Sequence, residues 1–131
     1  MVALKRVYEP ASRTDGRRVL VERLWPRGLR KDALALDEWA KEVAPSGELR
    51  RWFGHDPSRW EEFRRRYRAE LAKGPAREKL EELAAWARRQ RLTLLFSSRE
   101  LEHNNAVALA DEIERIARDR PAPPASGRPK R

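Results

Sequence analysis

Residues 92–96 read Leu-Thr-Leu-Leu-Phe, five consecutive positions that are apolar apart from one β-branched threonine. The run is too short for a typical helix, and it lacks the alternation with polar residues that marks a half-exposed strand. It therefore predicts a strand that is buried on both faces. Such strands belong to parallel sheets that are covered on both sides. The run favours an α/β fold in which residues 92–96 form a central strand.

Two earlier segments, 3–8 and 19–25, are also short, apolar and rich in β-branched residues, and we expect both to be buried strands. Residues 10–17 lie between them and contain Thr14-Asp15-Gly16, a turn-forming sequence with room for at most a short helical turn. The three expected strands define a small parallel sheet.

The other segments have helical periodicity. We expect a short helix over 34–44, from the spacing of Leu36, Trp39 and Val43, and a second one that is capped by Ser46 and ended by Gly54. Further helices are expected from Asp56-Pro57 to Gly74-Pro75, over 76–90 and over 104–118. The predicted fold is a small three-layer α/β domain, with a short, mainly parallel sheet flanked by helices.

The charge of the chain favours anionic partners. Its 131 residues fit one domain, which we place at 1–120, and residues 121–131 are expected to form a disordered, basic, proline-rich tail. The net charge is +9, and removal of the three basic residues of the tail leaves +6 (27 minus 21). A basic body attracts small anions, nucleic acid or acidic protein surfaces, and does not choose among them.

Several classes of protein are excluded by absent features. There is no cysteine, so disulfides, thiolate nucleophiles and Cys-ligated metal centres are ruled out. No apolar window is long enough to span a membrane, and charges near the N-terminus argue against a signal peptide, so we expect a cytoplasmic protein without membrane contact. The glycine-rich loops that bind dinucleotides and nucleoside triphosphates are missing. We predict neither a cofactor nor a metal, and the oligomeric state is undetermined.

Ligands of open parallel sheets bind at the carboxyl ends of the strands, where loops and helix N-termini meet. At these ends the sequence has arginines beside a tryptophan, followed by amides, in an arrangement that provides guanidinium groups for an anion and an indole face for a ring. The predicted ligand-binding residues are Tyr8, Arg23, Trp25, Arg27, Arg99, His103, Asn104 and Asn105.

Structural explanations of the same residues remain open. Trp25 could belong to the core, the arginines could pair with Glu22, Asp15 or Asp37, and Ser97-Ser98 could cap the segment that follows. The run Arg64-Arg65-Arg66-Tyr67-Arg68 resembles a nucleic-acid-binding patch. Tyr67, however, falls on the apolar stripe of its helix, so we expect the tyrosine to face the core and the arginines to face solvent.

A set of motifs is spread over the chain from about Val2 to Ile116. The motifs are Lys5-Arg6-Val7-Tyr8, Asp15-Gly16, Arg18-Val19-Leu20-Val21, Arg23-Leu24-Trp25-Pro26-Arg27-Gly28, Leu36-Asp37-x-Trp39-x-Lys41, Ala44-Pro45-Ser46, Leu49-Arg50-x-Trp52-Phe53 and Leu92-Thr93-Leu94-Leu95-Phe96-Ser97. Together they resemble the YeaO-like branch of the bacterial domain-of-unknown-function family 488 (DUF488). The resemblance implies a small cytoplasmic α/β domain without an assigned function.

The resemblance also implies a difference in chemistry. Distant members of the wider family have a Cys-His-Arg-like motif at the start of the last helix. Members of the YeaO-like branch have a motif similar to Asn-His-Ala at the same place. This chain has Asn104-Asn105-Ala106, with His103 one residue earlier. If the wider family uses the thiol or the histidine for chemistry, this chain lacks it, and binding without turnover is the conservative expectation.

Three hypotheses follow. The leading one is a protein that binds an anionic or phosphate-bearing ligand, nucleotides included, at the strand-end edge. The second is an enzyme acting on a nucleotide or nucleic-acid base, with His103 or Tyr8 in proton transfer and Asp15 or Asp37 as an orienting carboxylate. The third is a nucleic-acid-binding or regulatory protein that uses the net charge and the basic tail.

Overall fold

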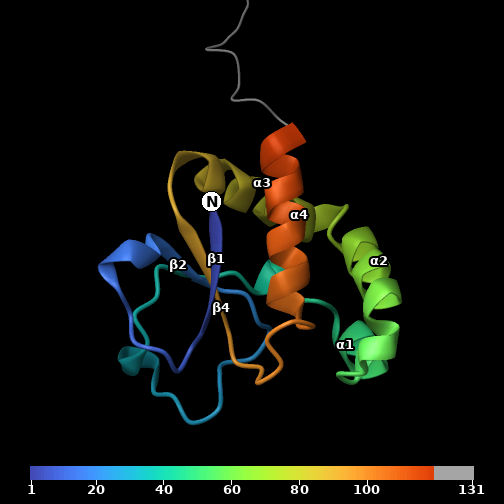
Figure 1. The fold of residues 1–131 in the computed structure, drawn as a ribbon, viewed down its shortest axis with the longest axis horizontal. Helices are drawn as coiled ribbons and strands as arrows, with labels where there is room; N and C mark the ends of the chain where they lie inside the picture. The colour runs from blue at the N-terminus through green and yellow to red at the C-terminus, as the bar shows by residue number, and fades with distance from the viewer. Residues whose placement is uncertain (120–131) are drawn as a thin grey trace, which may run out of the picture.

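Four parallel strands form one sheet in the computed structural model, which describes residues 1–119 (Figure 1). The order across the sheet is β1-β4-β2-β3. The strands are β1 (Val2–Arg6), β2 (Arg17–Leu20), β3 (Glu38–Trp39) and β4 (Leu92–Phe96). The predicted α/β class and its parallel sheet are confirmed.

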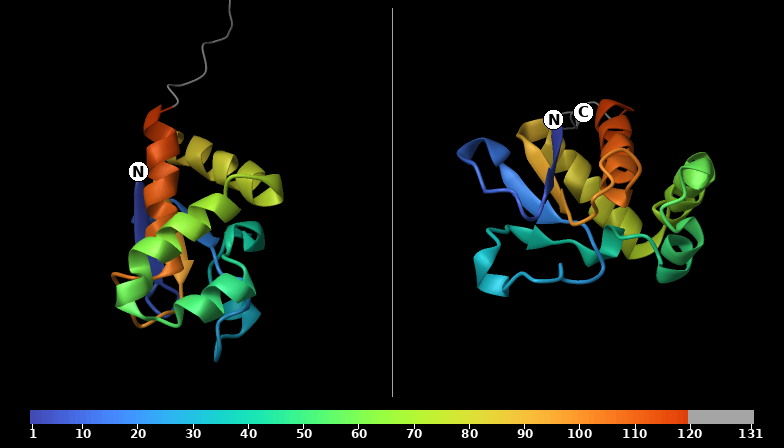
Figure 2. Two further views of the ribbon diagram at one scale, coloured as in Figure 1. Left: turned by 90° about the vertical axis from the view of Figure 1, so that its right-hand side faces the viewer. Right: turned by 60° about the horizontal axis from the view of Figure 1, so that its bottom comes forward.

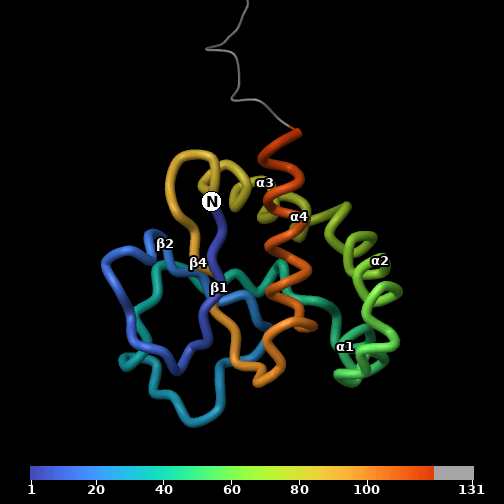
Figure 3. Tube along the Cα trace, viewed as in Figure 1, coloured from blue at the N-terminus to red at the C-terminus, as the bar shows by residue number. Residues whose placement is uncertain are grey.

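Strand β4 is the central strand, as its unbroken apolar character predicts. It pairs with β1 on one side, from Val2↔Leu92 to Arg6↔Phe96, and with β2 on the other, from Arg17↔Leu92 to Leu20↔Leu95. All five of its residues are buried. Although β1, β2 and β4 are far apart in sequence, the chain trace brings them side by side and in the same direction (Figure 3).

Strands β1 and β2 end earlier than predicted. β1 stops at Arg6 rather than at residue 8, and β2 stops at Leu20 rather than at residue 25. The backbone N–H of Val21 still donates to the carbonyl of Leu95, at 3.3 Å, and the chain then leaves the sheet. Residues 22–27, the first four of which were expected to continue the strand, are therefore a loop at the carboxyl edge.

One face of the sheet is covered by α-helices (Figure 2). The helices are α1 (Gly47–Phe53), α2 (Trp60–Glu70), α3 (Gly74–Arg89) and α4 (Asn105–Asp119). Because side chains alternate along a strand, Leu92, Leu94 and Phe96 point to this face and join one core cluster with helix residues such as Leu109 and Ile113. This cluster is the main hydrophobic core.

The opposite face is covered by short 3-10 helices and loops, which form the third layer of the predicted three-layer domain. Leu20 and Leu95 point to this side and form a second cluster with Val7 and Leu34, against which Trp25, Leu29, Leu36 and Trp39 pack. Two of these short elements are η1 (Arg13–Asp15) and η2 (Lys31–Ala33). The short helical turn expected within residues 10–17 is η1.

The predicted helix over 34–44 is wrong. The chain there runs from η2 into the two-residue strand β3, which pairs with β2, and then into the 3-10 turn η3 (Lys41–Val43). Leu36 and Trp39 belong to the cluster on the second face, whereas Val43 belongs to the main core. The helical spacing of Leu36, Trp39 and Val43 therefore does not come from a helix. It comes from an extended chain that passes the edge of the sheet.

The helix boundaries follow the capping signals in most places. The Ser46 hydroxyl accepts a hydrogen bond from Leu49 N–H at the start of α1, and Gly54 ends it in the left-handed conformation. The Asp56 carboxylate accepts from Ser58 N–H, but it caps the 3-10 turn η4 (Pro57–Arg59) that leads into α2. Gly74, predicted to stop a helix, instead begins α3.

Tyr67 faces the core, as predicted, and is 1% exposed. Its hydroxyl donates to the carbonyl of Val43, and burial raises the pKa of the phenol above its usual range. On the outer side of α2, Arg65 and Arg66 donate hydrogen bonds to Glu62, which lowers the pKa of that carboxyl to about 2. Arg64 and Arg68 pair with Asp111 and Glu112 of α4. The arginine run is therefore a helix face compensated by acids of α2 and α4.

No helix within residues 1–119 is long and apolar enough to cross a membrane. The predicted tail at 121–131 lies outside the described residues.

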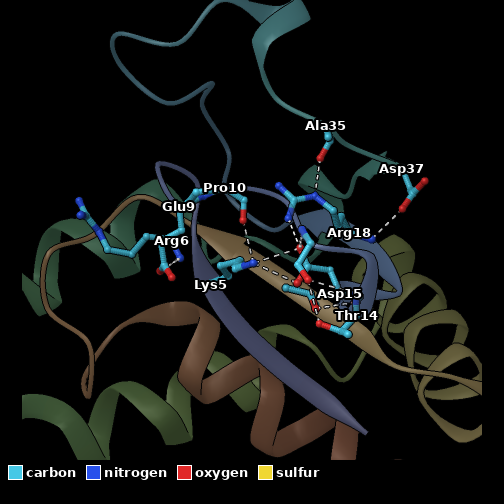
Figure 4. A network of polar contacts seen from close by, with 11 residues as sticks. Lys5, Arg6, Glu9, Pro10, Thr14, Asp15, Arg18, Ala35 and Asp37 are labelled. Carbon is cyan, nitrogen blue, oxygen red and sulfur yellow. Dashed lines mark hydrogen bonds and ion pairs between the residues drawn. The ribbon is translucent and has the colours of Figure 1, made fainter.

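A buried ionic network joins β1, η1 and β2 (Figure 4). Asp15 is 6% exposed, and its carboxylate accepts hydrogen bonds from Lys5, Arg18 and Ser12 N–H. Burial by itself would raise the pKa of Asp15, but these hydrogen bonds outweigh it and lower the pKa to about 2. The network fixes η1 against the second face of the sheet, where Thr93 donates to the carbonyl of Asp15.

We predict that Asp15→Asn lowers the free energy of unfolding by about 3 kcal/mol, because it leaves the Arg18 guanidinium, which is 6% exposed, without its counter-ion. Urea unfolding at pH 7 measures this. Asp32→Asn is the matched control, because the pair of Asp32 with Arg30 is exposed, and it should change stability by less than about 0.5 kcal/mol.

The same carboxylate gives a pH dependence. Its pKa in the folded state lies below the ordinary 3.8, so its contribution is present above about pH 4 and is lost as the pH falls toward about 2. The wild-type protein should lose stability over this window more steeply than Asp15→Asn. Equal slopes, or a loss below about 1 kcal/mol at pH 7, would contradict the assignment.

Candidate functional site

A cavity of about 330 Å³ lies at the carboxyl edge of the sheet, where the loops after β2 and β4 meet α1 and the start of α4. This is the edge at which ligands of parallel sheets bind. It is lined by Glu22, Arg23, Leu24, Trp25, Pro26, Arg27, Ala44, Pro45, Arg50, Phe53, His55, Phe63, Ser97, Ser98, Asn104 and Asn105. Five of the eight predicted ligand-binding residues are among them.

The loop after β2 is held in place by Glu22. Its carboxylate accepts hydrogen bonds from the N–H and the hydroxyl of Ser97, at 2.9 and 2.7 Å, which ties this loop to the end of β4. The backbone carbonyl of Glu22 accepts from the indole N–H of Trp39 at 2.7 Å. Residues 22–27 thus leave the sheet in a fixed direction along the cavity.

Trp25 combines a structural role with a place in the cavity wall. Its indole N–H donates to the carbonyl of Leu29 at 2.7 Å, and its ring meets Trp39 edge to face, with 5.4 Å between centroids. The indole nitrogen is therefore committed to the fold. What Trp25 offers to the cavity is ring surface.

The cavity arginines have no carboxylate partner within residues 1–119. Arg23 donates to the carbonyl of Pro45 at 3.2 Å, and no ion pair involves Arg23, Arg27 or Arg50 in that part of the chain. The acids considered as partners have other donors: Glu22 accepts from Ser97, Asp15 from Lys5 and Arg18, and Asp37 from Arg18 N–H. The structure thus leaves three guanidinium groups at one cavity without a counter-ion.

Asn104 and Asn105 line the cavity but also support the fold. The Asn104 side chain accepts from Val107 N–H at 3.0 Å and donates to the carbonyl of Glu100 at 2.7 Å, so it caps the start of α4. The amide of Asn105 donates to the carbonyl of Val21 at 3.0 Å, across from the end of β2. Asn104 is 3% exposed.

Tyr8, Arg99 and His103 lie outside the cavity lining. The Tyr8 hydroxyl donates to the carbonyl of Arg27 at 3.0 Å, and its ring is 47% exposed. Arg99 is exposed on the loop after β4. His103 packs edge to face on Trp60, with 5.2 Å between ring centroids, and its Nδ1 lies 3.5 Å from a carboxylate oxygen of Glu100. Within residues 1–119, neither His103 nor Tyr8 contacts Asp15 or Asp37, the orienting carboxylates of the enzyme hypothesis. His103 pairs with Glu100, and the two aspartates accept from Lys5 and Arg18.

The loop 97–104 is ordered by its own polar groups. The Ser98 hydroxyl accepts a hydrogen bond from Glu100 N–H. Ser98 thus caps the segment that follows it, which was the structural explanation considered for Ser97-Ser98. Glu100 in turn accepts from Glu102 N–H and His103 N–H, and these hydrogen bonds lower the pKa of its carboxyl. Arg6 donates to the carbonyls of Ser97 and Ser98, which attaches the loop to β1.

Five polar residues of the cavity were not among the predicted ligand-binding residues: Glu22, Ser97, Ser98, Arg50 and His55. Arg50 lies on α1, and His55 follows Gly54 with a positive φ of 58°, which is uncommon for a residue other than glycine. Both come from the segment between β3 and β4, and only the packing of α1 brings that segment to the strand ends. The turn signal Gly54-His55-Asp56-Pro57 was visible, but nothing in it indicates a place beside residues 22–27.

Within residues 1–119, no group of three or more His, Asp or Glu side chains is arranged to hold a metal ion. The arrangement places guanidinium groups around a cavity with apolar walls, and guanidinium groups are chemically suited to anions.

Comparison with known proteins places the chain among proteins without an assigned function. A family model described as the inactive DUF488-N3 subclade matches residues 1–128. The chain is 49% identical to the uncharacterised protein YeaO of Escherichia coli over 115 residues, which cover 88% of this chain and 98% of YeaO. It is 43% identical over 109 residues to the uncharacterised proteins Mb3100c of Mycobacterium bovis and Rv3073c of Mycobacterium tuberculosis, covering 83% of this chain and 90% of each relative. No solved structure matches significantly.

We predict that Asn104→Ala lowers the free energy of unfolding by about 1–2 kcal/mol, because it removes the cap of α4 and leaves buried backbone groups unpaired. Asn104→Asp, which keeps an acceptor for Val107 N–H, should recover part of this loss. Urea unfolding of the two variants measures the difference. An Asn104→Ala protein as stable as the wild type would show that the cap contributes little.

Proposed function

The chain belongs to the DUF488 family. We propose that it binds a small phosphate-bearing anion in the cavity at the carboxyl edge of the sheet without converting it. The observation that carries the proposal is the group Arg23, Arg27 and Arg50. These side chains line one cavity, and none of them pairs with a carboxylate within residues 1–119.

Guanidinium groups suit this task because their planar N–H groups match the oxygens of phosphate in pairs. Their charge acts more strongly inside a cavity with low-dielectric walls than on an open surface. Leu24, Pro26, Pro45 and Phe53 supply such walls here. Only Glu22 contributes an opposite charge among the lining residues, so the cavity has a net positive charge.

The size of the cavity limits the ligand. About 330 Å³ is at the low end of ligand pockets, which range over roughly 300–1,000 Å³. A mononucleotide or a smaller phosphate ester fits this volume, whereas a dinucleotide would extend into solvent. The ring face of Trp25 supports ligands that have an apolar or planar part beside the anion.

Binding rather than turnover is supported by the acid-base groups near the cavity. His103 lies outside the lining, and His55, which lines it, has no hydrogen bond within residues 1–119 to orient its ring. A general base requires such an orienting partner to hold the reactive nitrogen in place. The description of the matching subclade as inactive agrees with this interpretation.

We predict that phosphate esters stabilise the wild-type protein and that Arg23→Ala, Arg27→Ala and Arg50→Ala each weaken binding by about tenfold, the cost of one charge-assisted hydrogen bond. Isothermal calorimetry with adenosine 5′-monophosphate and inorganic phosphate measures the affinities, and thermal shifts measure the stabilisation.

Arg118→Ala is the control for these variants. It removes the same charge at the exposed far end of α4, and it should leave the affinity within about twofold because exposed charges at that distance are screened. The proposal fails if no phosphate compound binds, or if Arg118→Ala weakens binding as much as the cavity variants do.

A further inference from the structure

The cavity combines its three arginines with one carboxylate, that of Glu22. A site built only for a bare anion gains nothing from a negative charge in its lining, because the charge repels the ligand. Glu22 lies directly beside Arg23 in the chain and two residues beyond the end of β2. Its hydrogen bonds with Ser97 give it a structural role, and its negative charge in the lining also acts on any ligand that the cavity takes.

The hydrogen bonds of Glu22 leave part of its acceptor capacity unused. Each carboxylate oxygen accepts one bond from Ser97, Oε2 from the N–H and Oε1 from the hydroxyl. A carboxylate has about four acceptor sites, so about two remain. No cation lies within ion-pair distance of Glu22 among residues 1–119. The two unused acceptor sites therefore belong to a carboxylate that its hydrogen bonds with Ser97, directly after β4, hold in place.

The arginines of the cavity and its one glutamate differ in burial. Arg23, Arg27 and Arg50 are exposed residues, whereas Glu22 is half-buried next to the end of β4. Because the arginines are the more exposed lining residues, a strongly hydrated phosphate is accommodated most easily beside them. Groups of the ligand that reach Glu22 are deeper and must donate hydrogen bonds to a carboxylate. Sugar hydroxyls are donors of this kind, and acidic side chains at strand ends bind ribose hydroxyls in dinucleotide-binding folds.

We propose that the ligand is a sugar phosphate, either free or as the ribose phosphate of a nucleotide, with its phosphate on the cavity arginines and its hydroxyls donating to Glu22. The assignment rests on the proposed function, because it takes the arginines as the phosphate site. It adds that the protein selects phosphate esters with hydroxyl groups over those without.

The test compares two phosphate monoesters of the same charge, D-ribose 5-phosphate and methyl phosphate, by calorimetry on the full chain. The wild-type protein should bind ribose 5-phosphate at least about tenfold more tightly, because a hydrogen bond to a charged acceptor contributes about that factor. In Glu22→Gln the affinity for ribose 5-phosphate should fall, while that for methyl phosphate should stay equal or rise as the repulsion is removed. The ratio of the two affinities should decrease by about fivefold or more.

Ser97→Ala is the matched control. It removes one of the two hydrogen bonds that hold Glu22 but keeps the carboxylate, so it should preserve the preference for ribose 5-phosphate. A purely structural role of Glu22 would make both variants weaken both ligands by similar factors. That result, or an unchanged affinity ratio in Glu22→Gln, would overturn the assignment. Thermal unfolding of each variant confirms that it is folded before binding is measured.

The outcomes separate this inference from the proposed function. If the two esters bind the wild type equally and Arg23→Ala weakens both, the anion site stands and the sugar assignment falls. If neither ester binds, the proposed function itself falls. Adenosine 5′-monophosphate distinguishes the two sources of the sugar phosphate. Tighter binding than ribose 5-phosphate supports a nucleotide, and equal or weaker binding supports a free sugar phosphate, provided in either case that Glu22→Gln lowers the affinity.

Discussion

The parallel pairing of β4 with β1 on one side and β2 on the other is the constraint on which the rest of this structure depends. Parallel strands in register end at the same edge, so the chain segments after all three strands meet there. Hydrogen bonds then connect these segments: Tyr8 to the carbonyl of Arg27, Arg6 to the carbonyls of Ser97 and Ser98, and Ser97 to Glu22. The cavity is thus a consequence of sheet topology, and its walls are linked by polar contacts before any ligand arrives.

Charge is distributed differently over the helices and the strand ends. On α2 and α4 the arginines pair with nearby acids, as Arg65 does with Glu62 and Arg115 with Asp119, and such exposed pairs contribute little to stability. At the cavity the cationic side chains lack such partners within residues 1–119, although the chain has 21 acidic residues. The net charge of the chain is therefore less informative than the places where the charge is left uncompensated. This contrast is the physical basis for proposing an anion site at the strand ends.

Much of the fold could be predicted from the sequence, because its signals are local. The apolar run of β4 and the caps at Ser46 and Asp56 depend on neighbouring residues alone. The segment 34–44 could not be predicted in this way, since Trp39 and Val43 pack on opposite sides of the sheet and only their spacing imitates a helix. The same difference between local and long-range signals explains which residues of the candidate site could be predicted. Arg23, Trp25 and Arg27 follow a recognisable strand, but Arg50 and His55 reach the cavity through the packing of α1, and Asn104 serves α4 as its cap.

If anions bind at the carboxyl edge of the sheet and not on the basic helix faces, as we propose, the tryptophans beside the cavity should respond to them. The five tryptophans of the chain allow a direct measurement, because each has one indole N–H signal in a ¹⁵N-correlated NMR spectrum. Titration with ribose 5-phosphate should shift the signal of Trp25, which lines the cavity, and that of Trp39, which contacts it. Trp86, which packs against Arg17 and Arg89 away from the cavity, should stay unchanged. Shifts at Trp86 with none at Trp25 would contradict the claim.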